Sequence, residues 1–267
     1  FGGMAPKNLQ VINGGIARHQ TLGWLAQLRQ AGVHFVNVSP MRSDVTEHVQ
    51  ADWLAIRPNT DTALMLGLAH TLLVENLHDE AFLARYCVGF ERFRAYLLGH
   101  PDGQPKDAAW AAAITEIAAD TIRQLARRMA AVRTMITVSW SIQRADHGEQ
   151  PYWAAISLAA MLGQIGLPGG GFGFGYGATG GHGNPMPAVM PQPKLPTGSN
   201  AVKTAVPVAR FSDMLLHPGS PYDFNGQRLT YPDVRLVYWC GGSPFHKIQD
   251  LNRLLRAWQQ PEAIIIH

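Results

Sequence analysis

Residues 119–163, ADTIRQLARRMAAVRTMITVSWSIQRADHGEQPYWAAISLAAMLG, contain the stretch that decides the fold class. Residues 119–132 place apolar side chains at helical spacing, and TMITVSW at 134–140 is the most strand-like run in the chain. The polar run SIQRADHGEQ at 141–150 follows the strand and leads into a second helix. A helix, a strand, a polar loop and a helix in this order predict an α/β domain whose ligands bind at the loop after the strand.

The same alternation continues on both sides of this stretch. Strands are predicted at 34–38, 51–56, 234–239 and 263–266. Helices are predicted at 20–32, 62–76, 79–87, 90–99, 107–114, 119–132, 148–166, 208–216 and 250–258. Together they predict an open, mostly parallel sheet with helices on both faces, which is a Rossmann-like fold. Both ends of the chain have the sequence of interrupted strands, so we expect an internal fragment of a longer protein.

Composition excludes several classes of function. The chain is 46% apolar with a formal net charge of +3, and its longest basic run is Arg127-Arg128, so a nucleic-acid-binding stripe is not indicated. Cys87 and Cys240 lie far apart, which excludes an iron–sulfur cluster or a zinc site built in this region. No apolar run approaches the length of about 18 residues that a membrane-spanning helix needs.

A glycine-rich run, LPGGGFGFGYGATGGHG at 167–183, contains the spacing G-x-G-x-x-G at Gly175, Gly177 and Gly180. In dinucleotide-binding proteins a strand precedes this motif and a helix follows it. Here a predicted helix precedes it, and the proline-rich run at 184–200 cannot continue as a helix. We therefore expect a long surface loop over 166–206 and not a phosphate-binding loop.

Four loops at the carboxyl ends of predicted strands carry the chemistry of a nucleotide site: 2–8, 39–44, 140–150 and 241–247. They combine small residues, hydroxyls, amides and single cations, which suit phosphate groups. Before the helix at 62–76, Asp61 has two equally favoured roles, as an acceptor for a guanine edge or as a simple helix cap. The sequence shows neither a metal-binding spacing of histidines nor a recognisable Ser/His/Asp set, so these residues alone do not indicate a reaction.

Five segments are similar to a known family in their order and spacing: SPMRSD at 39–44, RPNTDTALMLGLAHTLL at 57–73, WSIQRADHGEQPYW at 140–153, AAMLGQIGLPGGGFG at 159–173 and GGSPFHKIQDLNRLLRAW at 241–258. They resemble the molybdopterin oxidoreductases of the dimethyl sulfoxide reductase family. Within it, the resemblance is greatest to reductases of dimethyl sulfoxide, trimethylamine N-oxide or biotin sulfoxide. It covers nearly the whole chain.

The resemblance implies a molybdenum cofactor with two molybdopterin guanine dinucleotides, held by two related α/β domains. It assigns 1–20 to the first part of a split cofactor domain, 21–232 to a Rossmann-like domain that binds one dinucleotide, and 233–267 to the return into the split domain. It also implies the cofactor-binding residues Lys7, Asn8, Val38, Ser39, Arg42, Asn59, Thr60, Asp61, Trp140, Ser141, Arg144, Ser243 and Lys247. Ser243 and Lys247 depart from the family's Asn and His, so these two contacts are the least secure.

The implied reaction removes oxygen from a small S-oxide or N-oxide. The family's metal-ligand serine lies upstream of the matched segments, so no catalytic residue or metal ligand is expected in this chain. The implied partners are the remainder of the same polypeptide and a cytochrome electron donor, and a periplasmic enzyme of anaerobic respiration, exported folded, is favoured over a cytoplasmic one. Two alternatives stay open: a region of a nitrate reductase or formate dehydrogenase, and a non-catalytic guanine-nucleotide-binding module.

Overall fold

The computed structural model describes residues 1–8, 20–175, 195–196 and 198–267. The chain divides into two compact units, Phe1–Pro191 and Gln192–His267, and each is described by itself. This boundary lies within the glycine- and proline-rich stretch, whereas the sequence places its main boundary near residue 232. The three-part division expected from the sequence concerns a longer protein and stays a prediction.

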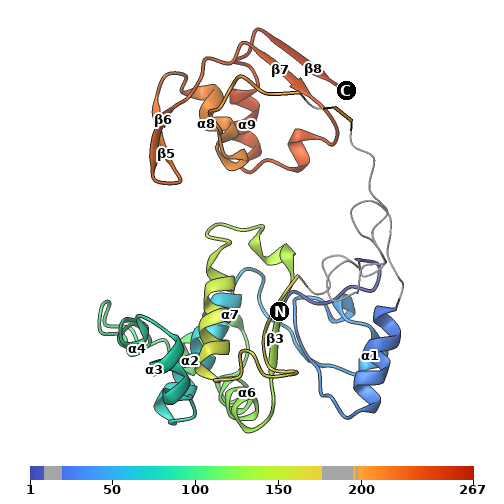
Figure 1. The fold of residues 1–267 in the computed structure, drawn as a ribbon, viewed down its shortest axis with the longest axis vertical. Helices are drawn as coiled ribbons and strands as arrows, with labels where there is room; N and C mark the ends of the chain where they lie inside the picture. Colours follow the sequence, from blue (N-terminus) through green and yellow to red (C-terminus); the bar gives the residue numbers. More distant parts are fainter. Residues whose placement is uncertain (9–19, 176–194, 197) are drawn as a thin grey trace. The chain divides into compact units, whose positions relative to one another are not determined.

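The first unit alternates helices and short strands, as the sequence predicts (Figure 1). In chain order they are α1 (Thr21–Gln30), β1 (Val36–Val38), β2 (Asp52–Leu54), α2 (Asp61–Val74), α3 (Glu80–Tyr86), α4 (Phe90–Leu97), α5 (Ala108–Thr115), α6 (Ala119–Ala131), β3 (Met135–Val138), α7 (Gln150–Met161) and β4 (Gly171–Phe174). The mixed α/β class is therefore confirmed.

Helix α2 is the centre of this unit. Its sequence is apolar on nearly every side, which is typical of a helix buried all round. It packs against α5, α6 and α7, and Gly67 permits the close approach to α5 because a Cβ built there would lie 2.6 Å from that of Ala111. The core that surrounds α2 fixes the direction of its axis, so the first residue of the helix, Asp61, has a fixed place.

The strands pair in parallel as β1 with β2 and β3 with β4. Residues 1–4 hydrogen-bond to both pairs: the Gly2 amide donates to the Val38 carbonyl at 3.0 Å, and the Ser139 amide donates to the Phe1 carbonyl at 3.0 Å. Met4 also forms a parallel bridge with Val45. The carboxyl ends of β1 and β3 are therefore tied to one segment.

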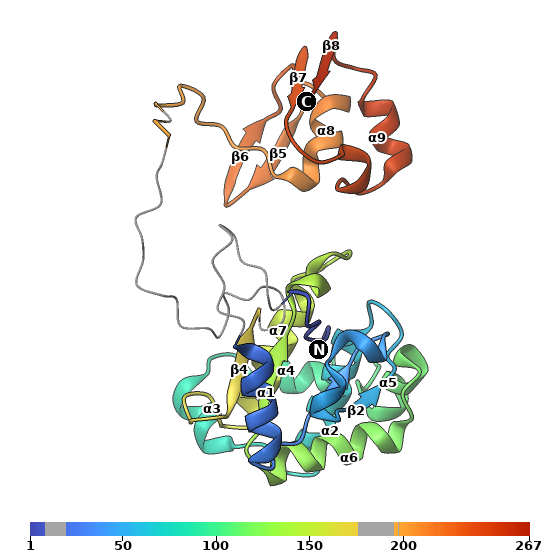
Figure 2. The ribbon, with the colours of Figure 1, turned by 90° about the vertical axis from the view of Figure 1, so that its right-hand side faces the viewer.

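The second unit contains α8 (Phe211–Leu216), β5 (Pro221–Phe224), β6 (Gln227–Thr230), β7 (Leu236–Trp239), α9 (Leu251–Ala257) and β8 (Ala263–Ile266). Strands β7 and β8 pair in parallel, and α8 packs against α9 (Figure 2). Val237 is buried with Leu215 and Ala257. An antiparallel hairpin, β5 with β6, turns at Asn225-Gly226, where both residues have positive φ.

Two elements differ from the sequence prediction. Residues 171–174 form strand β4, so the prediction of an unbroken surface loop over 166–206 is wrong there, and a strand does precede Gly175. At the start of this pairing the Gly171 amide donates to the Thr134 carbonyl at 3.0 Å, and the Gln164 side chain accepts from the Thr134 amide at 2.7 Å. The hairpin β5–β6 was not predicted. Residues 176–194 and 197 lie outside the described residues.

The described strands form four two-stranded sheets. The single open sheet expected from the sequence is not seen among these pairs and stays a prediction. Among the described helices, none combines the length and apolar character needed to cross a membrane.

Candidate functional site

The first candidate element is the loop that follows β1. Ser39 is 1% exposed; its hydroxyl donates to the Asp44 carboxylate, and its carbonyl accepts from Trp53 Nε1 at 2.8 Å. The Asn37 amide donates to the carbonyls of Met41 and Arg42 at 3.4 and 3.5 Å. These bonds fix loop 39–44. Since the Ser39 hydroxyl is engaged within the protein, what the loop presents outward is its exposed cation, Arg42.

Val38 and the segment at 7–8 fill different roles. The Val38 side chain is buried in the core, so a ligand would meet this residue only through its backbone. Lys7 and Asn8 are exposed, and the Asn8 amide closes a turn onto the Ala5 carbonyl at 2.9 Å. The turn directly follows the Gly2–Met4 segment that joins β1 to β3. Lys7 therefore belongs to the same edge of the fold as Arg42.

The second element is the entry into α2. Asn59 is exposed in the left-handed region at φ 65°, and Thr60 occupies the N-cap position. The Thr60 hydroxyl donates to the Arg57 carbonyl at 2.7 Å and caps no helix amide. Asp61 is the first helical residue and 7% exposed. Asp61 is thus not the N-cap residue, which removes the main argument for a purely capping role.

Burial raises the pKa of the Asp61 carboxyl above its ordinary value of 3.8, while its own backbone N–H opposes the rise. A buried carboxylate is costly unless donors satisfy it. Asp61 is therefore suited to a ligand that brings hydrogen-bond donors to the start of α2.

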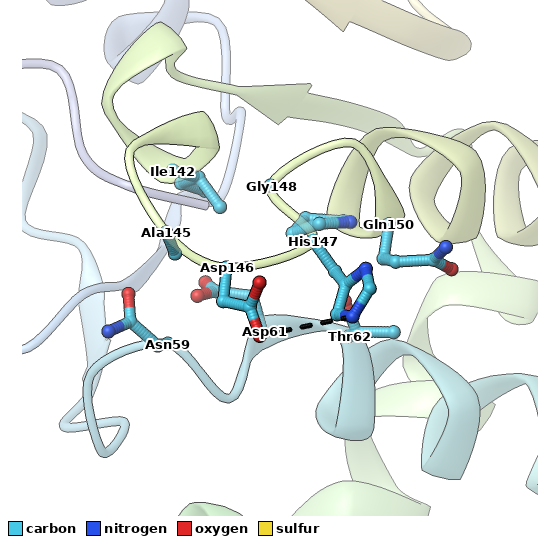
Figure 3. A pocket seen from close by; sticks show the side chains of 10 residues that line it. Asn59, Asp61, Thr62, Ile142, Ala145, Asp146, His147, Gly148 and Gln150 are labelled. Carbon is cyan, nitrogen blue, oxygen red and sulfur yellow. Dashed lines mark ion pairs between the residues drawn. The ribbon is translucent and has the colours of Figure 1, made fainter. Parts of the chain in front are cut away.

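A pocket of about 220 Å³ opens beside Asp61 (Figure 3). Its lining comes from the start of α2 and from the loop between β3 and α7: Asn59, Asp61, Thr62, Ile142, Ala145, Asp146, His147, Gly148, Gln150 and Pro151. Among these lining residues there is no Lys or Arg. A pocket that combines apolar atoms with carboxylates and amides, and has no lining cation, is suited to a flat polar ring with donors on its edge and not to a phosphate.

The turn at 143–148 shapes the far wall of the pocket. His147 has φ 51°, and a Cβ built on Gly148 would lie 2.0 Å from the Gln143 carbonyl oxygen, so only glycine fits there. The His147 ring lies 3.8 Å from both the Asp146 and Glu149 carboxylates (Figure 3 shows the first of these pairs). The backbone of this turn, more than its exposed ion pairs, fixes the wall.

The third element is the short helix at Trp140–Gln143, directly after β3. Trp140 is half-buried and its ring lies 5.9 Å from that of Phe174. Ser141 and Arg144 are exposed; the Ser141 hydroxyl lies 3.2 Å from that of Ser139, and the Arg144 amide donates to the Ser141 carbonyl at 3.0 Å. This loop thus offers an aromatic ring, a hydroxyl and a cation next to the pocket wall.

Ser243 and Lys247 lie in the second unit, after β7. Gly241 and Gly242 both have positive φ, and Trp239 Nε1 donates to their carbonyls at 3.1 and 2.9 Å. The Lys247 side chain folds over Gly242, where an added Cβ would lie 2.6 Å from Nζ. Loop 241–247 is therefore ordered by its own contacts, and its part in a shared site stays a prediction.

Of the residues named from the sequence, Asn59 and Asp61 line the pocket, while the lining residues Ile142, Asp146 and His147 were not singled out. All three lie in the polar run at 141–150 that follows β3, and this position in the sequence could have identified them. Within the described part of the chain, no group of three or more His, Cys, Asp or Glu side chains is placed to hold a metal ion.

Comparisons with protein families and with curated proteins point to one protein family. The family model described as Molybdopterin oxidoreductase matches residues 18–267. The chain is 52% identical to biotin sulfoxide reductase of Cereibacter sphaeroides over 100% of this chain and 36% of the relative. It is 44% identical to dimethyl sulfoxide/trimethylamine N-oxide reductase of the same organism over 98% of this chain and 33% of the relative.

Among solved structures, acetylene hydratase from Pelobacter acetylenicus aligns at 25% identity with a TM-score of 0.47, over 55% of this chain and 19% of its own. The chain thus spans about a third of the length of the curated relatives it matches.

Proposed function

The chain belongs to the molybdopterin oxidoreductase family, and from this premise we propose that it is the central cofactor-binding region of a longer molybdenum reductase of S-oxides or N-oxides. The similar proteins named above reduce biotin sulfoxide, or dimethyl sulfoxide and trimethylamine N-oxide. The observation that carries the proposal within the structure is Asp61, a buried acid in the wall of a pocket whose lining contains no cation.

The pocket fits the base of a guanine dinucleotide. Guanine presents two neighbouring N–H donors on one edge, and the ionised Asp61 carboxylate accepts two hydrogen bonds. Ile142 and Pro151 supply apolar atoms for the flat faces of the ring. Adenine presents an acceptor where guanine presents its ring N–H, so the same carboxylate disfavours it.

The phosphates and the pterin need different partners, and neighbouring loops supply them. Lys7, Arg42 and Arg144 are exposed cations on the loops that follow residues 1–4, β1 and β3 respectively. Trp140 offers a ring, and Ser141 a hydroxyl, to the pterin portion. We assign the remaining contacts, through the backbone of Val38 and Ser39 and the side chains of Asn8, Asn59 and Thr60, to the same dinucleotide.

When bound, the molybdenum cofactor supplies the two-electron chemistry that removes oxygen from the substrate as water with two protons. The residues of this chain bind and orient the dinucleotide. The buried Asp61 holds the base, the three cations hold the phosphates, and Trp140 covers the pterin. We assign no proton transfer to any residue of the chain.

We propose that the parallel strand pairs of the first unit join into a single sheet in the whole enzyme. Residues 1–4 hydrogen-bond to the ends of both β1 and β3, which favours the order β2, β1, residues 1–4, β3, β4. The pairs β1–β2 and β3–β4 are parallel, as in a Rossmann-like sheet. In this proposal residues 1–4 belong with 21–232, which differs from the assignment of 1–20 to a second domain, and residues 233–267, with Ser243 and Lys247, belong to that second domain.

The rest of the longer polypeptide is the partner that we propose for α7. This helix is apolar, yet Trp153 and Ile156 are 63% and 45% exposed on one side of it. Apolar side chains three residues apart on a helix share a face, and soluble proteins seldom leave such a face uncovered. We further propose export to the periplasm and a cytochrome donor, which cell fractionation and reduction assays would test.

The decisive experiment uses the natural full-length protein. Metal analysis by mass spectrometry and extraction of guanine nucleotides should give a ratio of about two guanine dinucleotides per molybdenum. Reduction of sulfoxides and amine oxides by the same preparation should follow. Guanine nucleotide without molybdenum would instead identify a binding module without turnover, and the absence of both would overturn the proposal.

A further inference from the structure

Two aromatic side chains that the sequence analysis assigned to no role contact the segment that carries Trp140. They are Tyr152, on the first turn of α7, and Phe174, the last residue of β4. Figure 1 shows α7 beside β3, the strand that leads into Trp140. The two rings meet edge to face with centroids 5.4 Å apart, and the Phe174 ring lies 5.9 Å from the Trp140 ring.

The Tyr152 hydroxyl holds the backbone at this point. It donates to the carbonyl oxygens of Ser139 at 2.9 Å and Trp140 at 3.2 Å, so one hydroxyl links the end of β3 to the start of the next helix. Burial raises the pKa of the Tyr152 phenol above 10.0, and the hydroxyl therefore keeps its proton over the working range. Tyr152 is thus a lasting donor to both carbonyls.

Strand β4 explains how Phe174 reaches this place. Its sequence GFGF alternates glycine with phenylalanine, and alternate residues of a strand point to the same face. Phe172 packs against the core, so Phe174 lies on the same face two residues further along, at the carboxyl end of the sheet. Gly171 and Gly173 are buried on the opposite face. The alternation therefore puts both phenylalanine side chains on one face of β4, and the glycines put no side chain on the other face.

We propose that Tyr152 and Phe174 are positioning residues that hold Trp140 in the geometry required for cofactor binding. Tyr152 fixes the backbone of Trp140, and Phe174 fixes its ring. Neither side chain needs to touch the cofactor. The inference rests on the proposed function, since it takes Trp140 as the residue that covers the pterin.

The test measures cofactor release from the full-length holoenzyme after dilution, together with thermal unfolding of the cofactor-free protein. The variants are Tyr152→Phe, which removes only the hydroxyl, Phe174→Leu, which removes the ring, and Phe174→Tyr, which restores a ring. Tyr222→Phe is the matched control, because the Tyr222 hydroxyl donates to the Ala205 carbonyl at 2.9 Å in the second unit. Trp140→Ala tests the underlying assignment.

Tyr152→Phe and Phe174→Leu should each speed cofactor release roughly fivefold, the factor that corresponds to one ordinary hydrogen bond or aromatic contact. Phe174→Tyr should restore the original rate. Tyr222→Phe should lower the unfolding temperature by a similar amount and leave release unchanged.

Three results would overturn the inference. If release in all variants follows only the loss of unfolding temperature, the two residues act on stability alone. If Trp140→Ala speeds release but Tyr152→Phe and Phe174→Leu do not, the positioning role is wrong while the proposed function stands. If Trp140→Ala has no effect, the role of Trp140 in the proposed function fails, and the positioning role fails with it.

Discussion

The hydroxyl of Ser39 donates a hydrogen bond to the carboxylate of Asp44, five residues further along the chain. The bond closes loop 39–44 on itself directly after β1. The Asp44 carbonyl also accepts from the Met4 amide at 2.6 Å, so the loop is tied to the segment that joins the two strand pairs. The exposed cation Arg42 is thereby carried on a fixed backbone.

Ser39→Ala should therefore destabilise the protein more than its size suggests. The change leaves a charged acceptor at Asp44 without its donor, which costs about 1.5–3 kcal/mol in free energy of unfolding. Urea unfolding of the cofactor-free protein measures the loss. Ser141→Ala is the control, since that hydroxyl is exposed and should change stability by less than about 0.5 kcal/mol. Equal effects of the two substitutions would show that the Ser39 bond does not hold the loop.

Asp61→Asn should separate binding from folding. Burial raises the Asp61 pKa in the folded state, so the carboxyl favours folding fully below its ordinary pKa of 3.8, and this contribution is lost as pH rises through the raised value. Above the raised value the ionised buried group opposes folding, and there the neutral amide should leave the unfolding temperature of the cofactor-free protein equal or higher.

Guanine nucleotide binding, in contrast, should become weaker in Asp61→Asn. Loss of a charge-assisted acceptor should weaken guanine nucleotide binding by about 1.5–3 kcal/mol, measured by calorimetry with GDP on the cofactor-free full-length protein. A fall in unfolding temperature for Asp61→Asn at pH 7, without loss of GDP affinity, would support a purely structural role for this carboxylate.

Much of the fold could be predicted because its signals are local. The run at 134–140 became β3, and the apolar run after Asp61 became the central helix α2. Strand β4 could not be predicted from composition, because glycine is depleted in strands and β4 forms by pairing with β3, which lies far earlier in the chain. The hairpin at 221–230 carries an Asn-Gly turn, a signal that was present but was not used.

In the candidate site, too, only the features with a local sequence signal could be predicted. Trp140 follows a clear strand and Asp61 precedes a clear helix, so these two positions in the fold followed from the sequence. The burial of Asp61 did not, because it depends on how α2 packs among α4, α5, α6 and α7. The engagement of the Ser39 hydroxyl by Asp44 also could not be foreseen, since a loop conformation determines it.

Gly171→Ala should prevent normal pairing of β4. Gly171 has φ 87°, and an added Cβ would lie 3.0 Å from the Ile165 Cα. The positive φ alone costs roughly 1–2 kcal/mol for alanine, and the backbone contact adds to it. Gly166→Ala is a matched control, because Gly166 has φ 88° with nothing within 4 Å of its added Cβ. Thermal unfolding should show a larger loss for Gly171→Ala, and equal losses would mean that the contact with Ile165 relaxes without cost.

Arg42→Gln and Arg144→Gln should each speed release of the cofactor about tenfold or more, because a lost hydrogen bond to a charged group corresponds to about 1.5–3 kcal/mol. Both residues are exposed, so raising the salt concentration should speed release from the native enzyme and narrow its difference from the variants. Arg144→Lys should recover only part of the effect, since lysine keeps the charge but not the paired N–H donors of the guanidinium. Arg92→Gln, on the exposed side of α4, is the control for a general loss of surface charge. Release that is independent of salt and equal in all four variants would contradict the assignment of Arg42 and Arg144 to the phosphates.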